Sequence, residues 1–132
     1  MAANRVAPSL EEFEALAADA FAALPAQMRR LCEGLEIFVA DFADAETLAA
    51  VSVDDPFELT GVYIGVDLSR KSVADPTPGP DRVVLYRRPI LDEWADHGTI
   101  TLGELVSHVL VHEIGHHFGL SDDDMHRIED ED

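Results

Sequence analysis

The stretch HEIGHHFGLSD, residues 112–122, carries most of the information on the fold class and indicates metal-dependent chemistry. Its first five residues form an HExxH motif, in which His112 and His116 stand four positions apart. Residues at this spacing lie one above the other on a helix face, so both imidazoles can reach one metal ion. Glu113 lies about 100° round the helix, off that face but close enough to contact a metal-bound water. The motif therefore predicts a zinc-binding helix that carries a catalytic base.

A tetrahedral zinc ion with two histidine ligands needs a third protein ligand and one open position for water. Gly119 is suited to end the helix and reverse the chain. Asp122 follows three residues later, and its carboxylate oxygen is a competent zinc ligand. His126 is the alternative third ligand. A second alternative is that Asp122 is a plain solvated acid in the acidic run 122–124.

The surroundings of the motif favour a functional site over a chance match. With six histidines and twelve glutamates in 132 residues, roughly 0.02 HExxH matches are expected by chance. Two further histidines are candidates for support of the site by hydrogen bonding, His108 one turn before His112 and His117 one turn after Glu113. The alternative for His108 is that its imidazole forms hydrogen bonds elsewhere and does not support the site. We interpret Cys32 as inert.

The motif lies in a helix that the sequence delimits well. Thr101 and Glu104 form a capping box at its start, and the apolar residues that follow recur at helical spacing up to Ile114. The helix is expected to be buried and to stop at Phe118. Further helices are predicted at 9–23, 26–32 and 43–51, strands at 35–42, 59–66 and 82–88, and a short helix from Pro89.

The segment Ser72–Pro80 holds three prolines and a glycine, which exclude regular structure. Because it joins two predicted strands, we expect it to border the active-site cleft as a semi-rigid flap; a loose surface connection is the alternative. Its flanks form a locally positive stretch in an otherwise acidic chain, which is expected to attract an acidic peptide; the basic residues are Arg70, Lys71, Arg82, Arg87 and Arg88.

Length and composition predict one domain over residues 1–132, with flexible ends at 1–8 and 126–132. Apolar residues make up 47% of the chain, enough for a core. The net charge of −18 opposes binding to nucleic acid. No apolar run is long enough to span a membrane, no signal peptide is recognisable, and a single cysteine fits a reducing compartment. These features predict a cytoplasmic protein, with no indication of its oligomeric state.

The sequence resembles the bacterial minimal zincins, also called zincin-like metallopeptidases. The matching pieces are HEIGHHFGLSDDD (112–124), DRVVLYRRPIL (81–91) and LTGVYIGVDLSRKSV (59–73), and the similarity runs from about residue 9 to residue 125. The resemblance implies an α+β fold, in which a small mixed sheet of three to four strands packs on the buried HExxH helix and an N-terminal helix.

The resemblance also implies a zinc peptidase with one zinc ion per chain. His112, His116 and Asp122 would be the metal ligands and Glu113 the catalytic base, acting on a peptide or protein substrate. The main alternative is a non-catalytic metal-binding interaction module of the same fold. A ribosomal-RNA endonuclease is a weaker alternative, since one such family has HxxxHxxxxxH spacing, but Glu113, Asp122 and the charge depart from that pattern.

Overall fold

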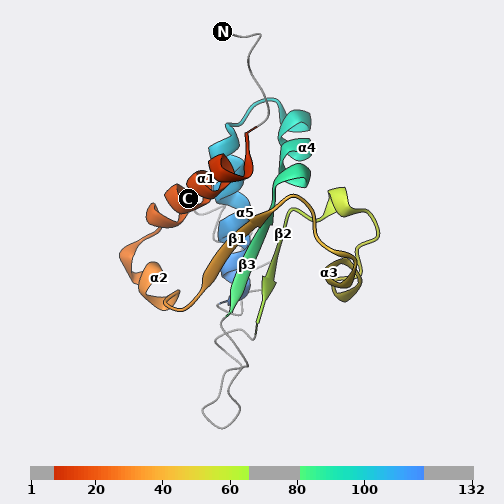
Figure 1. Ribbon diagram of the computed structural model, residues 1–132. Coiled ribbons are helices and arrows are strands. Elements are labelled where there is room, and N and C mark those ends of the chain that lie inside the picture. Colours follow the sequence, from red (N-terminus) through yellow and green to blue (C-terminus); the bar gives the residue numbers. More distant parts are fainter. Residues whose placement is uncertain (1–7, 66–80, 118–132) are drawn as a thin grey trace.

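The computed structural model describes residues 8–65 and 81–117, in which a three-stranded sheet is surrounded by helices (Figure 1). In chain order the elements are α1 (Leu10–Ala22), α2 (Ala26–Leu31), β1 (Glu36–Ala40), α3 (Ala45–Ala50), the 3₁₀ turn η2 (Pro56–Glu58), β2 (Gly61–Ile64), β3 (Arg82–Tyr86), α4 (Arg87–His97) and α5 (Leu102–His117). The predicted α+β fold is therefore confirmed, with each strand shorter than the apolar run that predicted it. None of these helices combines the length and apolar character that crossing a membrane requires.

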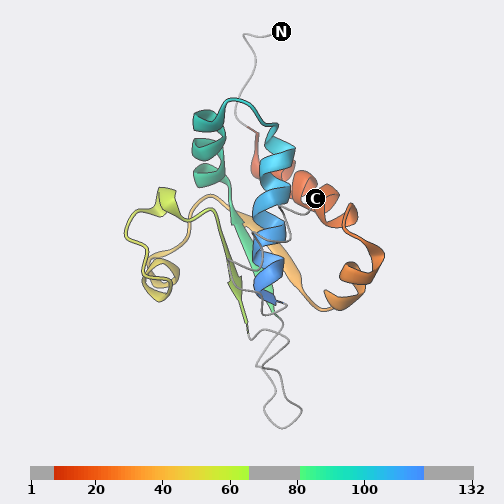
Figure 2. The same cartoon turned by 180° about the vertical axis from the view of Figure 1, so that it is seen from behind.

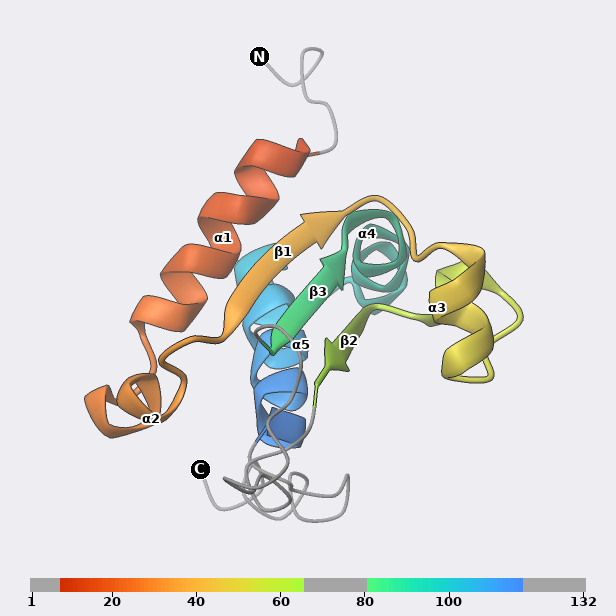
Figure 3. The same ribbon diagram turned by 60° about the horizontal axis from the view of Figure 1, so that its bottom comes forward.

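The sheet has the order β1-β3-β2 and is mixed, as predicted (Figure 3). The central strand β3 pairs in parallel with β1, where Phe38 faces Val84. It pairs antiparallel with β2, where Val62 faces the same Val84. In the described part of the sheet, β1 and β2 are thus the edge strands.

The two faces of the sheet have different partners because side chains alternate along a strand. One face carries Ile37, Val83 and Leu85 and packs on α1 and α5, where the main core lies. The views from the two sides show α5 crossing this face, with α1 alongside it (Figures 1 and 2). The other face carries Val62 and Tyr86, which pack against the segment around α3 in a second, smaller cluster. The metal helix is therefore held against the sheet through its apolar side.

Helix α5 has the position and the burial that the sequence predicts. The Glu104 N–H donates to Thr101 Oγ1 (3.0 Å) and the Thr101 N–H donates to Glu104 Oε1 (3.3 Å), which confirms the capping box. Six apolar side chains of the helix are buried: Leu102, Leu105, Val106, Val109, Leu110 and Ile114. The predicted stop at Phe118 and the turn at Gly119 lie outside the described residues.

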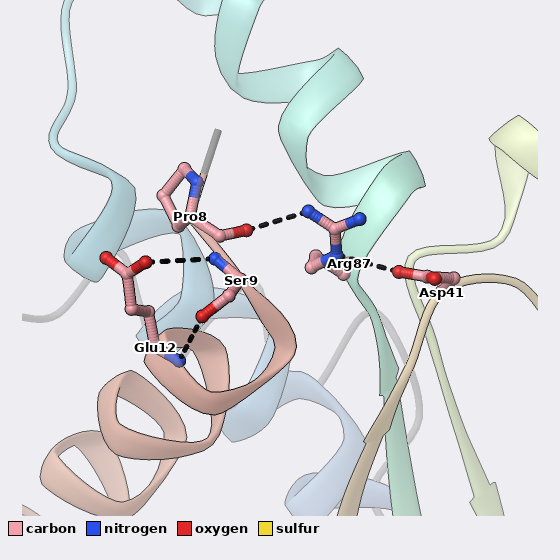
Figure 4. A network of polar contacts seen from close by, with 5 residues as sticks. All are labelled: Pro8, Ser9, Glu12, Asp41 and Arg87. Atoms are coloured by element: carbon pink, nitrogen blue, oxygen red, sulfur yellow. Dashed lines mark hydrogen bonds and ion pairs between the residues drawn. The ribbon is translucent and has the colours of Figure 1, made fainter. Parts of the chain in front are cut away.

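The N-terminal helix begins at a second capping box. The Glu12 N–H donates to Ser9 Oγ (3.2 Å), and the Ser9 N–H donates to Glu12 Oε1 (3.1 Å; Figure 4). Phe13, Ala17 and Ala20 form the buried side of α1. This side packs beside α5.

The predicted strand 82–88 is wrong at its end, because Arg87 and Arg88 belong to helix α4. Pro89 then occupies the third position of the helix, where its missing N–H costs nothing, since the first four N–H groups have no partner within a helix. Arg87 is held by partners far away in the sequence: its Nε donates to Asp41 Oδ1 and its Nη1 to the Pro8 carbonyl, both at 2.7 Å (Figure 4). Arg87 thus joins the starts of α1 and α4 to the end of β1.

Candidate metal centre

Helix α5 brings His112 and His116 to one face near its C-terminal end. The two ring centroids lie 5.2 Å apart, with the ring planes at 81°. In the described ranges, one ligand atom each of His112, Glu113 and His116 lie within 4.8 Å of one another. Both histidines are partly buried, which limits their rotamers while leaving access from solvent. The arrangement of the three side chains follows from helix geometry alone.

The donor set suits a zinc ion. Zinc takes imidazole nitrogens at about 2.0–2.1 Å, so two nitrogens of one tetrahedral site lie roughly 3.3 Å apart. Ligand atoms within 4.8 Å reach that separation by small rotations of the rings. Asp122 and its alternative His126 lie outside the described residues, so the identity of the third ligand stays a prediction.

Strand β2 lies directly against the side chain of Glu113 at Gly61. A Cβ atom added there would lie 3.0 Å from Val109 Cγ1 and 3.3 Å from Glu113 Cγ, both closer than an ordinary contact. Any larger residue at this position would require Val109, Glu113 or the strand itself to move by a few tenths of an ångström. Sequence reasoning missed Gly61, although an isolated glycine in a strand pattern often marks a close approach of backbone.

A cavity of about 180 Å³ adjoins the motif on the side of His108. Three segments contribute to its walls, and the lining residues are Thr60, Glu93, His108, Val109, His112 and Glu113. His108 is exposed and lies one turn before His112, so its predicted supporting role stays a prediction. Glu93, contributed by α4, was not recognised from the sequence. No spacing rule connects it with residues some twenty positions later.

The two strand tyrosines, Tyr63 and Tyr86, are packing residues. Tyr63 packs against the main core and donates its hydroxyl to Asp81 Oδ2 (2.9 Å). Tyr86 is buried in the second cluster. Burial raises the pKa of the Tyr86 phenol, and the nearby carboxylates of Asp44 and Glu113 add to this effect. The phenol is therefore neutral at ordinary pH.

Of the predicted positive patch, the structure describes three arginines, and Arg82 lies apart from Arg87 and Arg88. The Arg82 guanidinium lies 5.7 Å from the centroid of the Phe38 ring, on the sheet face opposite α5. Arg87 and Arg88 are placed at the other end of β3, about 13 Å along the strand. Arg87 is paired with Asp41 there. The proposed flap itself, together with Arg70 and Lys71, lies outside the described residues.

Comparison with known proteins adds one finding. The profile of a family described as zincin-like metallopeptidase matches residues 32–131. This match takes in the whole described sheet, α4 and all of α5 with its HExxH motif. No curated protein matches the chain.

Proposed function

Since the chain belongs to the zincin-like metallopeptidase family, we propose that it is a zinc-dependent peptidase whose catalytic base is Glu113. The observation that carries the proposal is the grouping of His112, Glu113 and His116 on a helix that the family profile includes. A purely structural zinc site closes all four coordination positions with protein ligands and has no use for a neighbouring carboxylate that does not bind the metal. The presence of Glu113 in the group therefore favours a hydrolase over a non-catalytic module.

His112 and His116 would hold one zinc ion per chain, and Asp122 would complete the set of protein ligands. Zinc, when bound, lowers the pKa of a coordinated water to about 7 and polarises a carbonyl oxygen. The apolar packing of α5 against the sheet holds the two imidazoles in place. Such support is needed because a ligand pair that moves freely binds metal weakly.

Glu113 would transfer the proton that the reaction requires. Its carboxylate accepts a proton from the attacking water as the oxygen bonds to the peptide carbonyl carbon. The same proton then passes to the amine nitrogen as the C–N bond breaks, so Glu113 ends the cycle unprotonated. Gly61 supports this role by allowing β2 to lie against the Glu113 side chain.

The edge of β2 offers a binding mode for the substrate. In the described part of the sheet this strand pairs with β3 on one side, and its other side is open. An extended peptide can add to such an edge by main-chain hydrogen bonds. A peptide paired near Gly61 would place its scissile bond beside Glu113.

The test is the substitution Glu113→Gln, with Glu36→Gln as a matched control on the opposite sheet face. We expect Glu113→Gln to retain zinc, measured by elemental analysis, and to lower peptide hydrolysis by about 10²- to 10⁴-fold, the usual contribution of a general base. Glu36→Gln should change neither. Cleavage by Glu113→Gln at the wild-type rate would refute the mechanism. Zinc binding without cleavage of any peptide by the wild type would favour the non-catalytic module.

A further inference from the structure

We propose that the cavity beside Glu113 is a subsite for a basic side chain, with Glu93 as the residue that recognises its charge. The cleavage preference that follows rests on the proposed function: substrates would carry lysine or arginine next to the cleaved bond. The binding of a cation in the cavity does not depend on catalysis.

The position of the cavity makes it part of the substrate path. His112 and Glu113 belong both to the cavity wall and to the metal centre, so a group in the cavity lies next to the reacting bond. The volume of about 180 Å³ is below the range of roughly 300–1,000 Å³ that whole small-molecule ligands occupy. The cavity therefore suits one side chain of a larger substrate.

The charged protein side chains of the lining favour a cation. Glu93 and Glu113 are the acidic members, and the lining residues include neither lysine nor arginine. Glu113 is engaged in proton transfer in the proposed mechanism, which leaves Glu93 to pair with the substrate. Val109 supplies an apolar wall for the methylene stem that lysine and arginine carry below their charged heads. An acidic peptide, which the sequence led us to expect, would be repelled here.

A neighbouring groove contributes two further acidic residues. A hollow of about 690 Å³ lies between α1 and α5, the two helices seen side by side in Figures 1 and 2. It shares His108 with the smaller cavity, and its charged lining residues are Asp19 and Glu104. A substrate that leaves the cavity along α5 thus meets further negative charge, which favours peptides with more than one basic residue.

Binding is tested with n-butylguanidinium, an arginine side-chain mimic, by titration of the amide NMR signals of zinc-loaded protein. We expect the amide signals of His108 and Val109 to shift. The dissociation constant should be about 5-fold higher for Glu93→Gln, which corresponds to the loss of one partly exposed ion pair. Glu36→Gln, which removes the same charge elsewhere, should leave the constant unchanged. Tetramethylammonium, a cation without donors, should bind more weakly. Equal affinity for wild type and Glu93→Gln, or shifts confined to other regions, would overturn the subsite.

Cleavage is tested with two quenched fluorescent peptide libraries that differ in one fixed residue, arginine or glutamate. Wild type should cleave the arginine library at least about 5-fold faster, and Glu93→Gln should lose this preference. Equal cleavage of both libraries overturns the proposed specificity and leaves the peptidase intact. Cleavage of neither library counts against the peptidase, and in that case the titration alone decides whether the cavity binds a cation.

Discussion

Replacement of Gly61 by alanine should destabilise the protein and slow the proposed reaction. The added methyl group would lie 3.0 Å from Val109 Cγ1 and 3.3 Å from both Glu113 Cγ and the Val84 carbonyl oxygen. Val109 cannot turn away, because a valine in a helix has one strongly preferred χ1 rotamer and this side chain is buried. The strain must therefore be relieved by a shift between β2 and α5.

Overpacking of this kind costs about 1–3 kcal/mol. The smaller loss of chain entropy on folding offsets about 0.4–1 kcal/mol of that, which leaves a net destabilisation of about 1.3 kcal/mol at the middle of both ranges and about 2.6 kcal/mol at most. The same shift displaces Glu113 by a few tenths of an ångström. Since a misplacement of 1 Å costs about 100-fold in rate, we expect kcat to fall about 3- to 10-fold with zinc content unchanged.

Urea unfolding followed by circular dichroism measures the free energy of unfolding, and Gly103→Ala provides the control. At Gly103 an added Cβ would meet the nearest side-chain atoms at 3.8 and 4.0 Å, which are ordinary contacts. Because Gly103 lies in α5, alanine there should stabilise the protein by about 0.5 kcal/mol. In a Val109→Ala background the cost of Gly61→Ala should shrink by about 1 kcal/mol. If both glycine substitutions stabilise the protein equally, the close approach at Gly61 does not exist.

The other predictions concern separate sites. Asp122→Ala should weaken zinc affinity by about 10- to 100-fold or more in a competition assay with a chelator, and unchanged affinity would favour His126 as the ligand. Cys32 is 3% exposed and burial raises the pKa of its thiol, so its reaction with a disulfide reagent at pH 8 should be about 100-fold slower in native than in unfolded protein; equal rates would contradict its burial. The folded-state pKa of Tyr86 is raised, so its contribution to stability is complete below about pH 10 and is lost as pH rises through the folded-state pKa. Tyr86→Phe should therefore reduce the loss of unfolding free energy above pH 10. An unaltered pH profile would argue against the burial of the Tyr86 phenol.

The parts of the fold that local interactions determine could be predicted from the sequence. The capping boxes at Ser9 and Thr101 use partners three residues away, and the apolar spacing of α5 names its buried side directly. The HExxH grouping is also local, because a helix alone brings His112 and His116 together. These features needed no knowledge of how the chain packs.

The parts that depend on distant contacts could not be predicted. The end of β3 is set by Arg87, which binds Asp41 and Pro8, 46 and 79 positions away. The approach of Gly61 to Glu113 and the contribution of Glu93 to the cavity depend on how β2 and α4 pack against α5. Short-range patterns contain no information on these distances.

Anomalous diffraction at the zinc edge, from crystals grown with zinc, tests the metal centre most directly. We expect one peak per chain, about 2.0–2.2 Å from a ring nitrogen of His112, a ring nitrogen of His116 and a carboxylate oxygen of Asp122. One coordination position should be open to solvent beside Glu113. The absence of a peak at α5, or a zinc ion closed by four protein ligands, would contradict the assignment of this chain as a zinc peptidase.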